Sequence, residues 1–114
     1  QYRCVFLREN ARVKPIAFAV LKDHAGGKLI MDLICPVALM KNAITILNQE
    51  LSKAEDSSEL RLWLTRSGVD KALTGDAIVN ELGIEIPCNS WNPGPSAELL
   101  NGAWWLTAGD MDFI

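Results

Sequence analysis

The chain has 114 residues, of which 49% are hydrophobic and 22% charged, and its net charge is −3 at pH 7. This length and composition predict a single globular domain over residues 1–114, and we expect that domain to be a processed product or a fragment of a longer protein. Because Lys and Arg residues are scattered along the sequence, we expect no nucleic-acid partner, and the short apolar runs predict no membrane partner.

Three short runs at the beginning of the chain have the composition of β-strands. Residues 2–8, 16–22 and 28–34 are rich in Val, Ile, Leu and Phe, and turn-forming residues separate them. Gly26 and Gly27 lie between the second and third runs, where a tight hairpin requires residues that accept a positive φ. The three runs therefore predict an antiparallel meander.

The hydrophobic period changes after the third run. Pro36 cannot donate a backbone hydrogen bond to a strand, and beyond it apolar residues recur every three or four positions as far as Leu51. This spacing predicts an amphipathic helix of about four or five turns. Alternation returns over residues 60–64, which predicts a fourth strand.

The remainder of the chain predicts a second helix and two further strands. Ser67 is a suitable helix cap, and an apolar stripe follows it up to Gly83. Residues 84–88 and 103–107 have the composition of strands. We therefore expect an α/β (α+β) fold of order β-β-β-α-β-α-β-β. Its sheet of about six strands is mixed and mostly antiparallel, two main helices flank it, and the strand at 28–34 lies beside the strand at 60–65.

This order of elements resembles the GNAT acyltransferase superfamily. The resemblance extends over most of the chain and is carried by these segments: KPIAFAVL at 14–21, the hairpin and strand at 26–36, residues 60–66, ELGIE at 81–85 and AWWLTAGDMD at 103–112. It implies transfer of an acyl group from acyl-CoA to an amine. That chemistry would use the splay of two neighbouring strands and backbone hydrogen bonds, or help from an N-terminal half that this chain lacks.

The same resemblance places the acyl-CoA pyrophosphate at the start of the first helix, where Ile34, Cys35 and Lys41 are the candidate cofactor-binding residues. The family has a glycine-rich loop there, whereas residues 35–42 contain neither glycine nor arginine. Val79 stands about where the family has its general-acid tyrosine. The family's first strand and first two helices are also missing, so the resemblance leaves open whether the domain is an active enzyme or a degenerate one.

Three residues are candidates for catalytic chemistry. His24 is the only histidine and lies beside the predicted hairpin, while Asp110 and Asp112 have the spacing of residues on one side of a strand. Each of them also fits an exposed position in a turn. We expect no metal site, because Asp110 and Asp112 offer too few oxygen ligands and the cysteines are widely spaced. The three cysteines indicate buried thiols and hence a cytoplasmic protein.

The tryptophans predict an interface. Trp104 and Trp105 are adjacent on a predicted strand, so they point to opposite faces, and one of them needs cover from a helix, a ligand or a partner. Trp91 lies in the Pro- and Gly-containing loop at 89–95. These residues predict a homodimer or another protein partner. The alternative function is therefore a non-catalytic protein-interaction module that uses an exposed tryptophan surface.

Overall fold

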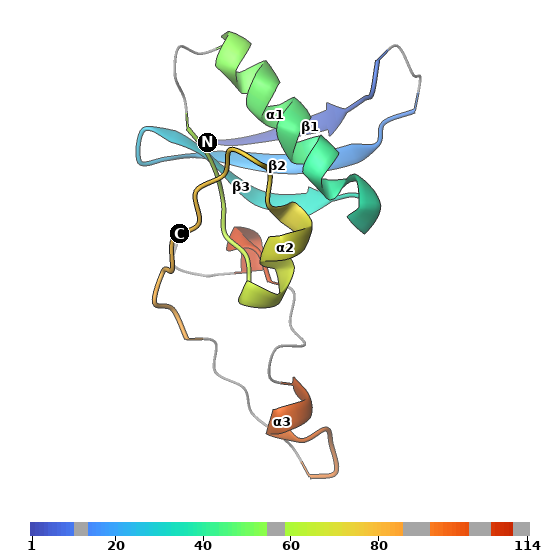
Figure 1. Cartoon of the computed structure of the whole chain (residues 1–114), viewed down its shortest axis with the longest axis vertical. Helices are drawn as coiled ribbons and strands as arrows, with labels where there is room; N and C mark the ends of the chain where they lie inside the picture. Colours follow the sequence, from blue (N-terminus) through green and yellow to red (C-terminus); the bar gives the residue numbers. More distant parts are fainter. Residues whose placement is uncertain (11–13, 55–58, 86–91, 101–105, 111–114) are drawn as a thin grey trace.

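The computed structural model describes residues 1–10, 14–54, 59–85, 92–100 and 106–110. It shows an α+β fold in which a four-stranded mixed sheet of order β1-β2-β3-β4 carries one long helix on one face (Figure 1). The strands are β1 (Tyr2–Leu7), β2 (Ala17–His24), β3 (Gly27–Ile34) and β4 (Leu60–Leu62). The helices are α1 (Met40–Ala54), α2 (Val69–Ala72) and α3 (Ala97–Leu100), with the 3-10 turns η1 (Val37–Leu39), η2 (Arg66–Gly68) and η3 (Ala108–Asp110).

The predicted antiparallel meander is confirmed. β1 pairs with β2 from Tyr2↔Lys22 to Leu7↔Ala17, and β2 pairs with β3 across the expected hairpin. Ala25 and Gly26 form the hairpin turn with φ values of 47° and 79°, so both central residues have the left-handed conformation that fits the twist of the strands. The register shifts beside Val20, which leaves Met31 of β3 without a direct partner on β2.

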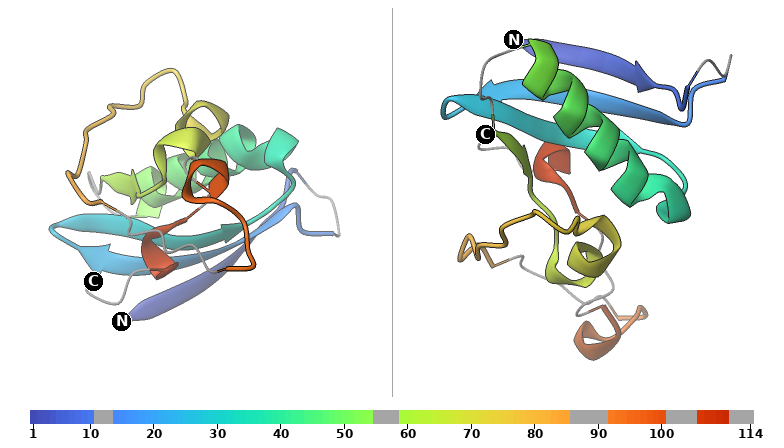
Figure 2. Two further views of the ribbon diagram at one scale, coloured as in Figure 1. Left: turned by 90° about the horizontal axis from the view of Figure 1, so that it is seen from below. Right: turned by 45° about the horizontal axis from the view of Figure 1, so that its top comes forward.

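The first helix is also confirmed. Pro36 ends the strand region, η1 follows, and α1 then lies across the sheet (Figure 2). The apolar stripe of α1 packs against the strands. The buried residues of this core come from both layers: Ala43, Leu47 and Leu51 of α1, and Leu7, Ala17, Ala19, Leu21 and Ile30 of the strands. Two of these residues, Ala17 and Ala19 of β2, are small and face α1.

The predicted adjacency of residues 28–34 and 60–65 is confirmed by a parallel ladder. β3 pairs with β4 from Lys28↔Leu60 to Ile30↔Leu62, and α1 forms the crossover between the two strands. The segments that lead into β3 and β4 approach each other closely where the ladder begins. Lys28 N donates to Glu59 O at 2.8 Å, and a Cβ atom on Gly27 would lie only 2.3 Å from the same oxygen.

The prediction of about six strands and two main helices is wrong. The second helix, predicted to run to Leu82, ends as α2 after four residues, and residues 77–85 have no regular structure. Leu73 is already extended at ψ 117°, and the Thr74 hydroxyl bonds the Asp76 carboxylate at 3.0 Å in the turn around Gly75. Thr, Gly and Asp favour turns over helix interiors, so this local turn ends the helix.

Neither of the last two predicted strands is found in the described residues. Ile84 and Glu85 are irregular and exposed, while residues 86–88 lie outside the described residues. Of the strand predicted at 103–107, Thr107 forms a single antiparallel bridge with Leu64, and residues 103–105 also lie outside the described residues. Among the helices that the structure describes, none is long and apolar enough to cross a bilayer.

Candidate functional site

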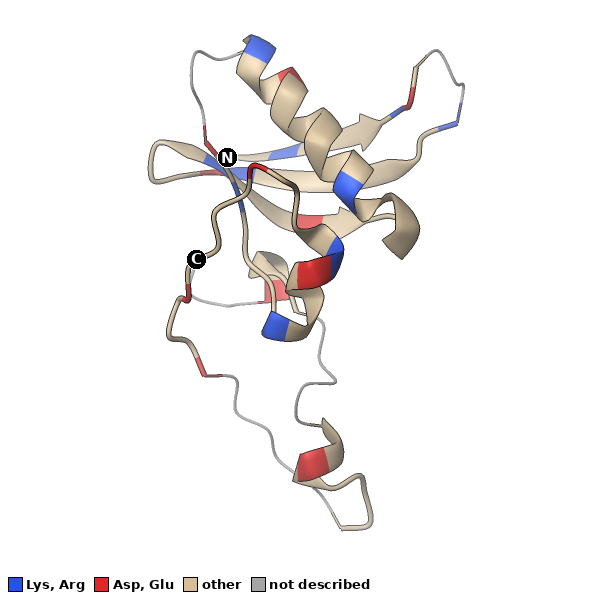
Figure 3. Cartoon of the chain, in the orientation of Figure 1, with Lys and Arg blue, Asp and Glu red and all other residues tan. Residues whose placement is uncertain are grey.

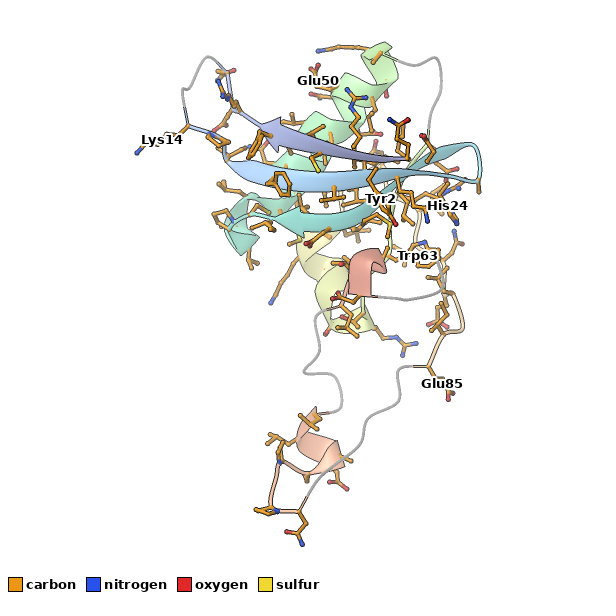
Figure 4. The ribbon with its side chains drawn as sticks, turned by 180° about the vertical axis from the view of Figure 1, so that it is seen from behind. Tyr2, Lys14, His24, Glu50, Trp63 and Glu85 are labelled. Carbon is orange, nitrogen blue, oxygen red and sulfur yellow. The ribbon has the colours of Figure 1, made fainter. Side chains whose placement is uncertain are left out.

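The two faces of the sheet differ in how they are covered. Side chains along a strand point alternately to the two faces of a sheet. Those that face α1 are buried at least in part: Val5, Leu7, Ala19 and Leu21. Their neighbours along β1 and β2 therefore point to the opposite side. We call that opposite side the open face. It comprises Tyr2, Cys4 and Phe6 of β1, Phe18, Val20 and Lys22 of β2, and Asp32 and Ile34 of β3. Figure 4 shows the sheet from this side, with α1 behind it.

Three large apolar residues of the open face are mostly accessible to solvent. Tyr2 is 60% exposed, Phe6 67% and Ile34 61%. The ring of Phe6 packs against Phe18 of the neighbouring strand with the ring centroids 5.0 Å apart. The Lys22 Nζ lies 5.6 Å from the centroid of the Tyr2 ring, within the range of a cation–π contact. Cross-strand contacts therefore hold the exposed rings in place on a regular sheet.

The turn η3 covers only the β3 side of this face. Its Ala108 is fully buried against Leu29 and Met31 of β3, and Val20 and Trp63 pack around them. Gly109 passes so close to β3 that a Cβ atom there would lie 2.7 Å from Met31 O. The rest of the face, toward β1, has no such cover from the described residues (Figure 4).

Asp110 closes the η3 turn. Its Oδ2 accepts hydrogen bonds from Thr107 N at 2.8 Å and from Thr107 Oγ1 at 3.2 Å, while Asp110 N donates to Thr107 O at 3.1 Å. The Asp110 carboxylate thus accepts from Thr107 N, as the acidic side chain of a capping box does, while Thr107 Oγ1 donates to the same oxygen and the Thr107 carbonyl accepts from Asp110 N. The structure therefore gives this candidate catalytic residue a role in the turn, and its predicted companion Asp112 lies outside the described residues.

His24 packs at the end of β2. Its ring meets Trp63 edge to face with the centroids 5.7 Å apart, and its Nδ1 is buried without a hydrogen-bond partner in the described part of the chain. Its carbonyl oxygen accepts a hydrogen bond from Arg61 Nη1 at 3.0 Å, which ties the hairpin to β4. The two catalytic candidates that the structure describes therefore contact different residues: His24 contacts Trp63, and Asp110 contacts Thr107.

The three candidate acyl-CoA residues lie around the junction of β3 and α1. Ile34 is exposed, whereas Cys35 packs at the edge of the core beneath α1, where burial raises the pKa of its thiol. Lys41 is exposed on the first turn of α1, and its carbonyl accepts the Thr45 hydroxyl at 2.9 Å. The Leu39 N–H is satisfied by Pro36 O at 2.8 Å, so this helix end does not direct that donor outward.

Charges and metal ligands show no concentration in the described residues. Figure 3 shows Lys and Arg interspersed with Asp and Glu along the ribbon. A hollow beside the N-terminus is lined by Arg3, Lys22 and Lys28, but Lys28 pairs with Asp23 and lowers the pKa of that exposed carboxyl. The described part of the chain also contains no group of three His, Cys, Asp or Glu side chains placed to hold a metal ion.

The predicted tryptophan interface remains a prediction, because Trp91, Trp104 and Trp105 all lie outside the described residues. The sequence analysis did not predict an interface on the open face. A signal was present: β1 and β2 carry apolar residues on both of their faces, as strands do when both sides of a sheet become covered.

Comparison with protein-family models, with curated proteins and with solved structures gave no match. The acyltransferase resemblance therefore rests on the residues quoted in the sequence analysis.

Proposed function

We propose that this chain is a protein-interaction module that binds a polypeptide through the open face of its sheet. The observation that carries the proposal is the exposure of Tyr2, Phe6 and Ile34 on a face that shares a sheet with a well-packed core. Contiguous apolar patches on a folded domain are typical of interaction sites. Each of these side chains would release roughly 100 Å² from water on burial, worth about 2 kcal/mol each. The three cysteines agree with a reducing compartment, and the cytoplasm is the location proposed with this function.

A photoreactive phenylalanine derivative tests this proposal when it replaces one residue at a time. Positions 6 and 34 lie on the open face, and Gln49, exposed on α1, is the matched control position. We expect cross-links to polypeptide, identified by mass spectrometry, from position 6, position 34 or both, and few from position 49. Equal labelling at the three positions, or none at positions 6 and 34, contradicts the proposal.

Acyl transfer from acyl-CoA to an amine is the second candidate. The parallel pairing of β3 with β4 favours it, because the family resemblance implies this neighbourhood of strands. Beyond Leu62, however, the chain pairs with its own C-terminal segment: Thr65 N donates to Leu106 O at 3.3 Å, and Leu64 bridges Thr107. Residues 106–110 thus lie against β3 and against the chain that follows β4, just beyond the end of the β3–β4 ladder (Figure 1).

Calorimetry with acetyl-CoA distinguishes the two candidates. We expect binding no tighter than millimolar, because residues 35–42 have no glycine that would let backbone N–H groups reach a pyrophosphate. Micromolar affinity would place acyl transfer ahead of the interaction module.

A further inference from the structure

β1 is an edge strand that lacks the usual protection against pairing. It is the first strand in the order β1-β2-β3-β4, and in the described residues no strand pairs with its outer side. Natural edge strands are commonly blocked by proline, by several charges or by a bulge. β1 contains no proline, its pairing with β2 is regular, and Arg3 is its only charged residue.

The sequence of β1 is symmetric about Cys4 on the open face. Tyr2 and Phe6, two aromatic residues, stand two positions before and two positions after it. If an antiparallel copy of β1 pairs with the strand about this centre, Tyr2 of each copy lies opposite Phe6 of the other, and the two Cys4 residues face each other. A two-fold interface requires a patch that complements itself, and this pattern meets that condition.

The alternative centre at Val5 gives poorer pairs. It would place Cys4 opposite Phe6 on the open face, and the charged Arg3 opposite Leu7 on the side of α1. With Cys4 at the centre, Arg3 lies opposite Val5, and the two arginines are not cross-strand neighbours. Aromatic pairs across strands contribute more to sheet stability than these mixed pairs.

We propose that two copies of this chain pair antiparallel through β1, centred on Cys4, and form one continuous sheet. The proposal rests on the proposed function and identifies its partner as a second copy. The contacts already present would extend across the junction, because Phe6 packs on Phe18 and Lys22 lies over Tyr2. A row of contacting side chains would cross the strands from Phe18 to Phe6 of one copy and continue to Tyr2 and Lys22 of the second copy.

The exposed side chains alone offer too little area for face-to-face stacking of the two sheets, and backbone hydrogen bonds favour edge pairing instead. The three exposed residues offer roughly 300 Å² per copy, so stacking would bury roughly 600 Å² from them, below the 1,200 Å² or so of a stable interface. Edge pairing draws on two of the same side chains and adds backbone hydrogen bonds, each worth about 1 kcal/mol. We expect a dissociation constant on the order of micromolar.

Sedimentation of two matched variants tests the mode of pairing. Phe6→Lys places a charge at the junction, whereas Ile34→Lys places one on the same face at a similarly exposed site two strands away. We expect a dimer for the unmodified chain, at least tenfold weaker association for Phe6→Lys, and little change for Ile34→Lys. A monomeric unmodified chain at hundreds of micromolar overturns the proposal, and so does equal weakening by both variants.

Disulfide formation at Cys4 tests the register independently and does not depend on the folding of either lysine variant. Opposed residues at the centre have Cα atoms about 4.5–5.5 Å apart, within disulfide range. In a Cys35→Ser, Cys88→Ser chain, mild oxidation should yield a covalent dimer through Cys4. A control with Cys4→Ser and Ile34→Cys should cross-link far more slowly, because its exposed thiol lies two strands away from the junction. Equal cross-linking in both chains, or none through Cys4, overturns the register.

The photo-cross-linking experiment separates the two proposals. Cross-links to a second copy of the chain from position 6, with few from position 34, support self-pairing. Cross-links from positions 6 and 34 to other polypeptides only would overturn self-pairing and leave the interaction module standing, whereas no cross-links at either position would overturn both.

Discussion

The region of β1, β2, β3 and α1 and the described residues between 73 and 100 both contain many apolar residues but pack very differently. In the first region, Ala19, Ala43 and Leu29 are fully buried. In the second, Ile78 is 87% exposed, and Val79, Leu82 and Ile84 are exposed as well. In Figure 1 α3 lies far from the sheet. Apolar residues define a structure only when a complementary surface lies within reach.

The two regions differ because α1 packs on the sheet first and the later helices are short. α1 lies directly after the meander and covers one sheet face at once, which stabilises its 15 residues. A four-residue helix such as α2 or α3 has little stability of its own and depends on tertiary contacts. The apolar stripe of α1 is already committed to the sheet when the chain reaches Leu73, and residues 77–85 are all exposed.

The largest expected effect compares one leucine from each region. Leu47 is 3% exposed in the core beneath α1, and Leu99 is 69% exposed on α3. Leu47→Ala should lower the free energy of unfolding by about 2–5 kcal/mol, since it leaves a cavity. Leu99→Ala should change it by less than about 0.5 kcal/mol. Urea denaturation measures both, and comparable losses would show that α3 is packed.

Two glycines provide the next comparison. At Gly27 an added Cβ would collide with Glu59 O, whereas at Gly75 nothing lies within 4 Å of it. Gly27→Ala should destabilise the fold by roughly 1–3 kcal/mol through overpacking at the start of the parallel ladder. Gly75→Ala should be neutral or stabilising, by up to about 1 kcal/mol. Thermal unfolding of the two variants checks this, and a harmless Gly27→Ala would refute the close approach of β3 and β4.

A smaller effect is expected where the C-terminal segment returns to the sheet. Asp110→Ala removes the carboxylate that accepts from Thr107 N and Oγ1, and loss of such a cap costs about 1 kcal/mol. Glu98→Ala, on α3, should leave unfolding unchanged because this helix contacts no core. Hydrogen exchange at Thr107, measured beside urea denaturation, should rise only in Asp110→Ala. An unchanged exchange rate there would mean that other contacts hold the turn.

The smallest effect concerns two thiols of the packed region. Cys4 is exposed on the open face, whereas desolvation raises the pKa of Cys35, so Cys35 has less reactive thiolate at a given pH. In a Cys88→Ser chain at pH 8, dilute enough to be monomeric, iodoacetamide should alkylate Cys4 several times faster than Cys35. Urea should abolish the difference, because unfolding returns the Cys35 pKa to its ordinary value. Equal rates in the folded chain would place Cys35 in solvent.

The sequence predicted the packed region because its signals were local and agreed with one another. Each signal indicated a single local structure: a hairpin turn at Gly26, the end of a strand at Pro36, and a helix in the spacing from Met40 to Leu51. The same kind of stripe around Val69 and Leu73 did not form a long helix, because the turn at Gly75 competed with it.

The candidate site was harder to predict than the meander. Tyr2 and Phe6 have the composition expected of a strand, and nothing in a single sequence shows which face of a sheet its helix will cover. The expected tryptophan surface depended on a strand at 103–107, of which only residues 106 and 107 are described. The capping role of Asp110 was detectable in the spacing Thr107–Asp110, which has the form of a capping box.

The contact between Thr65 and Leu106 has a kinetic consequence. It joins residues 41 positions apart, and closing a loop of that length costs roughly 3 kcal/mol of chain entropy. Two or three backbone hydrogen bonds and the burial of Ala108 offset a cost of similar size. The C-terminal turn should therefore dock last during folding and detach first, as a separate opening unit. Each such opening would expose Leu29 and Met31, which lengthens the apolar surface of the open face from β1 to β3.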